Sequence, residues 1–372
     1  MGFQDFLGNA QTVTHLRESI RAERFPHSLI LAGPKGAGKY TLALMLAKAV
    51  NCLEPTETPT ESGLLPDFCG QCRNCLRIDD SADLEARVAE AVEAREALRE
   101  TDKRETRILI QTHPDVLIVP PDPPQLLIKL GQVRQVIHVA YYRPPVESKR
   151  SFSIFTSSAF MKEAANSLLK VLEEPPEHTS LILLTENPQE MLPTIRSRAV
   201  IHRLGAIPSS DLESLLATRR PELKPADRAL AARLAEGAVG RALNLDLAAY
   251  LSSRQDALIL LRTALREPDY SQLFHATESY RAGAAGHEKT INLLRALGSL
   301  IEDLLLVVAG TPRLIRNLDL EAELAKLVRD SALTVDWIDS AARALTQVEQ
   351  GMRRNLLRSL SLDAMAVGLV RE

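Results

Sequence analysis

In the first 205 residues, short apolar runs alternate with longer stretches in which apolar positions recur at helical spacing. Runs that are apolar on both faces and separated by helices are typical of a parallel sheet covered by helices. The pattern therefore predicts an α/β domain over residues 1–205. Its expected strands are Ser28–Ala32, Asp115–Val119, Ser151–Thr156, Ser180–Thr185 and Ala199–Leu204.

Two stretches interrupt this alternation. Pro55–Pro66 is rich in Thr, Pro and Glu, and we expect a loop there. Asp79–Arg107 is strongly charged and has only a narrow apolar stripe, which predicts one exposed helix that projects from the domain. We interpret it as a solvated insertion without a catalytic role. The stripe consists of Leu84, Val88, Ala91, Arg95 and Leu98.

After Leu204 the strand signals stop, and helical patterns continue along the rest of the sequence. Between residues 206 and 250 they are broken by Pro221, Pro225 and two glycines, which is typical of short helices. We expect a small helical lid domain over 206–250 and an all-α C-terminal domain over 251–372.

Composition and charge narrow the function classes. The chain has 45 Lys and Arg against 48 Asp and Glu, a formal net charge of -3, which excludes a strongly basic nucleic-acid coat. The longest apolar run, Leu304–Ala309, is far too short to span a bilayer, and the N-terminus lacks the pattern of a secretion signal. We therefore expect a cytoplasmic protein with no membrane partner.

A glycine-rich segment follows the first expected strand and precedes a helix. Glycines there allow backbone N–H groups to surround phosphates, and a lysine at the end of the segment reaches the outer phosphates. The pattern predicts a phosphate loop for a nucleotide such as ATP or ADP. Its residues are Gly33, Pro34, Lys35, Gly36, Ala37, Gly38, Lys39, Tyr40 and Thr41.

Two positions that handle Mg²⁺ in nucleotide-hydrolysing proteins are missing. Tyr40 stands where Ser or Thr supplies the metal's hydroxyl ligand, and Thr41 lies about 100° further around the helix. The strand Ser151–Phe155 leads into Thr156 and Ser157, with no carboxylate to orient an attacking water. We therefore expect a degenerate site without functional Mg²⁺ and without hydrolysis by this chain. Whether it retains ATP or ADP stays open.

All four cysteines of the chain, Cys52, Cys69, Cys72 and Cys75, follow the spacing C-x16-C-x2-C-x2-C. Four thiolates suit a closed tetrahedral Zn²⁺ site, and two-residue gaps let sulfurs converge on one ion. Four protein ligands leave no open coordination position. The predicted role is therefore structural, with zinc as the expected ion and other thiophilic ions as the alternative.

Several longer motifs occur in a fixed order along the chain: Phe3–Asn9, His113–Asp115, Glu163–Pro176, Thr185–Pro188 and Gly240–Leu243. Together with the phosphate loop and the cysteines, they make the sequence resemble the clamp-loader branch of the AAA+ family. The most specific of them is Glu163–Pro176, which follows the strand Ser151–Phe155, after which no carboxylate occurs. The resemblance extends over nearly the whole chain.

The resemblance assigns roles to two arginines. Thr194–Ala199 corresponds to the Ser-Arg-Cys motif, whose arginine reaches the γ-phosphate held by the neighbouring subunit, and Arg198 stands at that position. Such an arginine finger stabilises charge on the transferring phosphoryl group. No acid close in sequence is expected to neutralise Arg198. Arg241 corresponds to the arginine of the lid's sensor 2 helix and belongs to the degenerate nucleotide site.

As a member of this family, the chain is expected to be a non-catalytic subunit of bacterial DNA polymerase III. It would form a hetero-oligomer with gamma/tau and delta clamp-loader subunits, joined by a collar built from residues 251–372. Through that complex it would contact the sliding clamp and primer–template DNA during ATP-dependent clamp loading. Two alternatives remain open, an active gamma/tau-type ATPase and a stand-alone, zinc-organised DNA-binding protein.

Overall fold

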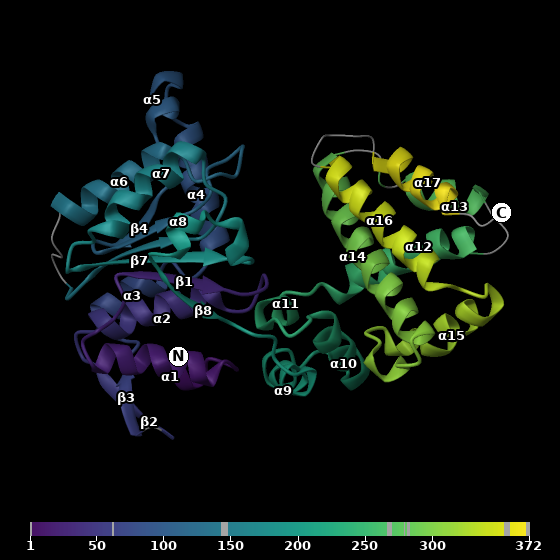
Figure 1. Ribbon diagram of the computed structural model, residues 1–372, viewed down its shortest axis with the longest axis horizontal. Coiled ribbons are helices and arrows are strands. Elements are labelled where there is room, and N and C mark those ends of the chain that lie inside the picture. The colour runs from purple at the N-terminus through teal and green to yellow at the C-terminus, as the bar shows by residue number, and fades with distance from the viewer. Residues whose placement is uncertain are drawn as a thin grey trace. The chain divides into compact units, whose positions relative to one another are not determined.

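The computed structural model describes residues 2–61, 63–142, 148–265, 270–278, 280, 283–352 and 358–369. The chain folds into two compact units, shown in Figure 1. The first contains Met1–Ile207 together with Ala238–Gly240, and the second contains Pro208–Gly237 and Arg241–Glu372. The further division of the helical part into a lid and a C-terminal domain stays a prediction.

The first unit is built on a six-stranded sheet in the order β4-β5-β6-β7-β1-β8. All five predicted strands are confirmed, and they run parallel to one another. The additional strand, β4, is short and pairs antiparallel to β5 at one edge of the sheet. The strands are β1 Ser28–Ala32, β4 Ile110–His113, β5 Val116–Val119, β6 Ser151–Phe155, β7 Thr179–Thr185 and β8 Val200–Arg203.

Helices cover both faces of this sheet (Figure 1). Leu29 and Leu31 of β1 pack into the core under α1, α2 and α3, whereas Ile30 and Ala32 pack into the core under α6 and α7. Because successive strand residues point to opposite faces, this alternation buries β1 completely. The covering helices are α1 Ala10–Arg21, α2 Lys39–Asn51, α3 Arg73–Asp79, α6 Leu130–Tyr142 and α7 Lys162–Glu173.

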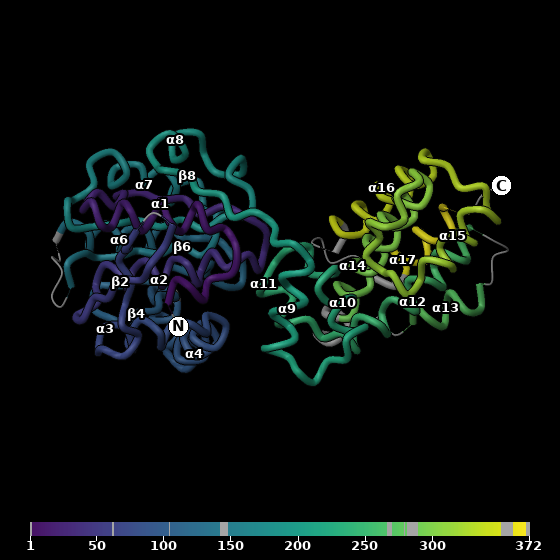
Figure 2. Tube along the Cα trace, turned by 90° about the horizontal axis from the view of Figure 1, so that it is seen from below, coloured from purple at the N-terminus to yellow at the C-terminus, as the bar shows by residue number. Residues whose placement is uncertain are grey.

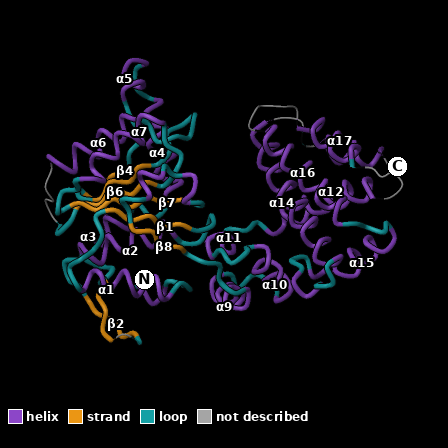
Figure 3. The backbone as a smooth tube through the Cα atoms, viewed as in Figure 1, coloured by secondary structure: helices purple, strands orange, loops and turns teal. Residues whose placement is uncertain are grey.

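The loop expected over Pro55–Pro66 is wrong, because this stretch forms a hairpin of β2, Thr56–Thr60, and β3, Gly63–Asp67 (Figure 3). Its stability comes from a distant residue. The guanidinium of Arg17 in α1 donates hydrogen bonds to the carbonyls of Pro66 at 2.8 Å and Leu65 at 2.7 Å. Composition predicted a loop because these contacts lie outside the local sequence.

The charged insertion also differs from the single projecting helix that we expected. It forms α4, Leu84–Glu96, and a short α5, Glu100–Glu105. Two stripe residues on α4, Leu84 and Val88, pack against the core of the first unit. Further along α4, the buried Arg95 pairs with the fully buried Asp122 at 2.6 Å. This ion pair holds α4 against the sheet domain.

The second unit is entirely helical among its described residues (Figure 2). Its longest helix, α14, packs against α12 and α16 through a row of buried leucines. In the described part of the chain, no helix has the length and apolar character needed to cross a membrane. The helices are α9 Ser209–Arg219, α10 Pro225–Leu234, α11 Val239–Leu243 (which begins in the first unit), α12 Leu247–Leu265, α13 Tyr270–Glu278, α14 Gly283–Val308, α15 Glu321–Asp330, α16 Val335–Met352 and α17 Arg358–Gly368.

Candidate functional site

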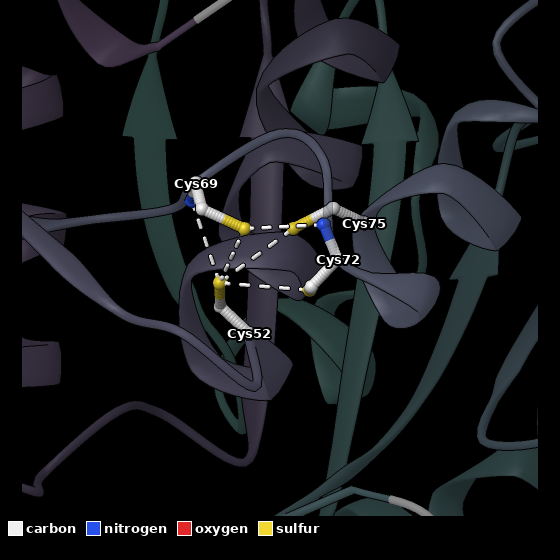
Figure 4. A group of neighbouring side chains, drawn as sticks. All are labelled: Cys52, Cys69, Cys72 and Cys75. Carbon is white, nitrogen blue, oxygen red and sulfur yellow. Dashed lines mark hydrogen bonds between the residues drawn. The ribbon is translucent and has the colours of Figure 1, made fainter.

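The fold brings the four cysteines together at the end of α2 (Figure 4). Cys52 caps the C-terminus of α2, and Cys72 caps the N-terminus of α3. Cys75 lies in the first turn of α3, and Cys69 follows the β2–β3 hairpin. All four sulfur atoms lie within 4.8 Å of one another. The cluster therefore joins α2, the hairpin and α3 at one point.

The spacing of the sulfurs fits a tetrahedral metal ion. The Sγ of Cys52 lies 3.5 Å from that of Cys69, 3.8 Å from that of Cys72 and 3.7 Å from that of Cys75. Zinc–sulfur bonds of about 2.3 Å in tetrahedral geometry place sulfurs about 3.8 Å apart. These four side chains therefore match the ligand number and geometry of a closed zinc centre.

Three thiols of the cluster, those of Cys52, Cys72 and Cys75, differ in acidity. Burial tends to raise the pKa of Cys72, but hydrogen bonds involving the backbone of Cys75 and Leu53 outweigh it and lower the pKa to about 6. Burial raises the pKa of Cys52 and of Cys75. Cys72 is therefore more readily present as a thiolate, the form that binds metals, than Cys52 or Cys75.

The predicted phosphate loop joins β1 to α2, between the strands β7 and β8 that flank β1. Gly36 and Gly38 have φ values of 84° and 87°, a left-handed backbone that favours glycine. The α2 helix begins at Lys39, so its N-terminus points into the loop. This is the strand–loop–helix context that a phosphate loop requires.

Within this loop, the lysine bonds to the loop itself. The ammonium of Lys39 donates to the carbonyls of Gly33 at 2.6 Å and Pro34 at 2.9 Å. Burial lowers the pKa of Lys39, against the opposing effect of the Glu186 carboxylate. The loop is further held by Gly240, whose amide donates to the carbonyl of Gly36 at 2.8 Å. A side chain at Gly240 would begin only 3.2 Å from Gly36.

Tyr40 turns towards the segment that follows the cysteines. Its hydroxyl donates to the backbone carbonyl of Ser81 at 2.6 Å, and its ring packs against the core. Burial raises the pKa of Tyr40 to about 12. At the end of β6, the next residues along the chain are Thr156, Ser157 and Ser158, so no acid follows this strand directly. The sequence did not indicate Ser81 as a partner, since a backbone acceptor has no sequence signal.

Arg198 lies just beyond the short helix α8, Pro193–Arg196, and it pairs with an acid that is distant in the sequence. Its Nη2 lies 2.7 Å from Oε1 of Glu173, the last residue of α7. Sequence reasoning missed this partner because the two residues are distant in the chain and meet only where α7 packs against α8. The motif Glu163–Pro176 includes Glu173, but its sequence did not indicate the contact with Arg198.

Asn187, from the motif Thr185–Pro188, and the predicted site residue Arg241 both form local contacts. The Asn187 side chain accepts a hydrogen bond from the amide of Gln189 at 3.0 Å and so caps a short 3₁₀ helix. Arg241 belongs to the second unit, in the segment Arg241–Glu372. It forms an ion pair with Glu236 of the same unit. The structure thus gives each polar group a local partner.

Comparison with known proteins decides the family. The model of a protein family described as "DNA polymerase III, delta subunit" matches residues 8–208, more than half of the chain. The chain belongs to this family. The match begins in the N-terminal motif and ends just after β8, so it covers the phosphate loop, the cysteine cluster and Arg198. The predicted fold class is also confirmed, with a parallel sheet, an early four-cysteine cluster and a helical remainder.

Individual relatives agree with the family. The DNA polymerase III subunit delta' of Bacillus subtilis (strain 168) is 35% identical over 184 residues, 49% of this chain and 43% of the relative. The DNA polymerase III subunit tau of Escherichia coli (strain K12) is 28% identical over 247 residues, 65% of this chain and 32% of the relative. The aligned part thus spans less than half of each of these two proteins.

Among solved structures, a DNA polymerase III gamma subunit-related protein from Thermotoga maritima is similar to this chain. It is 17% identical, with a TM-score of 0.43 and coverage of 96% of this chain and 98% of that one. The clamp loader delta protein of Bacillus subtilis is 12% identical, with a TM-score of 0.27 and coverage of 96% and 99%.

Proposed function

We propose that this chain is a delta'-type subunit of the DNA polymerase III clamp loader that does not hydrolyse ATP itself. Family membership and the similarity to a subunit named delta' support this role. In the complex it would stand beside gamma/tau and delta subunits and act on the sliding clamp and primer–template DNA through them. Its own contribution would be the shape of the assembly and one arginine supplied to a neighbour.

One observation carries the proposal of an inactive site. The residue after the phosphate-loop lysine is Tyr40. Its hydroxyl donates a hydrogen bond to the backbone carbonyl of Ser81, in the segment that follows the cysteine cluster. It is therefore unavailable as a metal ligand at the loop. The residues that follow β6 are uncharged, so the second magnesium-handling group is lacking as well.

The cysteine cluster supports a structural zinc ion. Cys52, Cys69, Cys72 and Cys75 would hold it, and when bound it would supply crosslinks between the end of α2, the β2–β3 hairpin and α3. All four ligand positions would be filled by protein, which leaves none for a substrate. We therefore propose that the ion stabilises the first unit and takes no part in a reaction.

Arg198 is the residue that we propose to act in trans. It is one-third exposed and follows α8 in a short turn, so its guanidinium is accessible to a partner. A guanidinium offers several N–H donors in a planar fork that matches phosphate oxygens. Supplied to the nucleotide of a neighbouring subunit, it would stabilise negative charge on the transferring phosphoryl group.

The test compares ATP hydrolysis by the purified chain with hydrolysis by a complex reconstituted with its partner ATPase subunits. We expect no hydrolysis by the chain alone, and a loss of about 10³-fold in the complex with Arg198→Ala, the lower end for arginine fingers. Arg203→Ala, which removes an exposed arginine of β8, is the matched control and should retain activity. An unchanged rate with Arg198→Ala contradicts the finger.

Hydrolysis by the isolated chain would contradict the inactive site. If Lys39→Ala then abolished that hydrolysis, the chain would be an active gamma/tau-type ATPase. Tight, salt-sensitive binding of primed DNA by the isolated chain would instead support the DNA-binding alternative.

A further inference from the structure

The guanidinium of Arg198 is held by three groups of its own chain. Its Nη2 pairs with Oε1 of Glu173 at 2.7 Å. Its Nη1 donates to the carbonyl of Thr194 at 3.0 Å and to the hydroxyl of Ser197 at 3.3 Å. Both terminal nitrogens, which a phosphate would engage as a fork, are therefore already bonded.

Negative charge around Arg198 stabilises its guanidinium cation while no phosphate is bound to it. Glu173 is the last residue of α7, and the C-terminus of a helix carries partial negative charge. The carboxylate and the helix end together neutralise the guanidinium. A phosphate approaching from a neighbouring subunit would meet this negative charge as well as the arginine, so the two anions compete for one cation.

We propose that Glu173 is a positioning residue for Arg198. It holds the guanidinium in a resting position, defined by the contacts with Glu173, Thr194 and Ser197. The phosphate bound to a neighbouring subunit must replace Glu173 as the partner of Arg198. This inference rests on the proposed function of Arg198 as a finger in trans. Glu173 thereby sets how readily the arginine reaches the nucleotide. It slows hydrolysis until the neighbour's phosphate is close enough to displace the carboxylate.

The strength of the pair suits such an exchange. The side chains of Arg198 and Glu173 are 34% and 49% exposed, so water screens their attraction. A half-exposed ion pair of this kind shifts an equilibrium by at most about fivefold. The resting position is therefore preferred without being locked.

Glu174 offers a matched control. It is the neighbour of Glu173, is also exposed and carries the same charge. Its backbone carbonyl accepts a hydrogen bond from the hydroxyl of Tyr141, and among the described residues no base forms an ion pair with its carboxylate. Neutralising it changes the net charge equally but leaves Arg198 held.

The experiment measures ATP hydrolysis by the reconstituted complex at low ionic strength. We expect Glu173→Gln to raise the rate by about two- to fivefold, because only a screened ion pair is lost. Glu173→Asp, which retains the charge, should restore a rate near that of the unchanged chain, and Glu174→Gln should have no effect. At high salt the gain from Glu173→Gln should vanish, because salt screens the pair in the unchanged chain.

The outcomes separate this inference from the proposed function. If Arg198→Ala abolishes activity while Glu173→Gln leaves the rate unchanged or lowers it, the resting position is wrong and the finger stands. If Arg198→Ala has no effect, the finger itself is wrong. A gain that persists in the double variant Glu173→Gln/Arg198→Ala would show that Glu173 acts independently of Arg198, which also overturns the inference.

Discussion

The hydroxyl of Tyr40 and the carbonyl of Ser81 are joined by a hydrogen bond of 2.6 Å across 41 positions of the chain. This bond connects the first turn of α2, at the phosphate loop, to the segment that follows the cysteine module. A position that serves nucleotide chemistry in phosphate-loop enzymes is thus occupied by a group that fastens two parts of the first unit together.

Tyr40→Phe should therefore lower stability without altering the chemistry of the chain. Ser81 is fully buried, so its carbonyl would lose its partner, and we expect a loss of about 1–2 kcal/mol in the free energy of unfolding. Urea denaturation followed by circular dichroism measures it. Tyr141→Phe, which removes a hydroxyl bonded to a carbonyl near the surface, should cost less. An equal loss in both variants would contradict the buried role of Tyr40.

The contribution of the Tyr40 hydroxyl should disappear in alkali. Its pKa is raised by burial to about 12 in the folded chain, against about 10 in the unfolded chain. A raised pKa means that the neutral form is the one stabilised by folding. The difference in unfolding free energy between the unchanged chain and Tyr40→Phe should be full below pH 10 and decline towards pH 12. A difference that stays constant from pH 9 to 12 would refute this.

Removal of the zinc ion that we propose for the four cysteines should destabilise the first unit. We expect one zinc ion per chain by mass spectrometry, and a lower melting temperature after treatment with a strong chelator. A loss of about 3 kcal/mol corresponds to roughly 6–12 °C for a unit of this size. Cys75→Ser, which removes a fully buried ligand, should reproduce the loss. The chelator should then have no further effect on that variant, and a further drop would place the metal elsewhere.

The buried pair of Arg95 and Asp122 should hold α4 in place. Among the described residues, Arg95→Met leaves the Asp122 carboxylate with one cationic partner, the ammonium of Lys129 3.2 Å away, and breaking a buried pair costs about 3–5 kcal/mol. Hydrogen exchange of the α4 amides should accelerate accordingly. Arg87→Met, which breaks an exposed pair with Glu90 on the same helix, should cost about 0.5 kcal/mol. Similar exchange in the two variants would mean that Arg95 does not anchor the helix.

The sequence predicted most of the sheet because its strands carry a local signal. Runs such as Ser180–Thr185 are apolar on both faces and bounded by turns, and the structure places them in the centre of the sheet. The cysteines were equally readable, because their spacing alone restricts how they can converge. In both cases the information lies within one short stretch of the chain, Ser180–Thr185 for this strand and residues 52–75 for the cysteines.

What the sequence did not reveal depends on contacts between distant residues. The β2–β3 hairpin exists where composition predicted a loop, because Arg17 satisfies its carbonyls from another element. Arg95 belonged to the narrow stripe of a helix that we expected to be exposed, yet it is buried and pairs with Asp122 from a different segment. Glu173 became the partner of Arg198 only through the packing of α7 against α8. The sequence shows where a polar residue lies along the chain, but it does not show which distant residue will be its partner in the fold.

The hydrogen bond from Gly240 to Gly36 has a practical consequence for dividing the protein. Ala238–Gly240 belongs to the first unit, although the family match ends at residue 208 and the segment Pro208–Gly237 belongs to the second. A fragment cut after Ile207 would look complete by sequence, yet its phosphate loop would lack the amide that holds the Gly36 carbonyl. The shortest fragment that retains the intact loop must therefore extend past Gly240 and carry α9 and α10 with it.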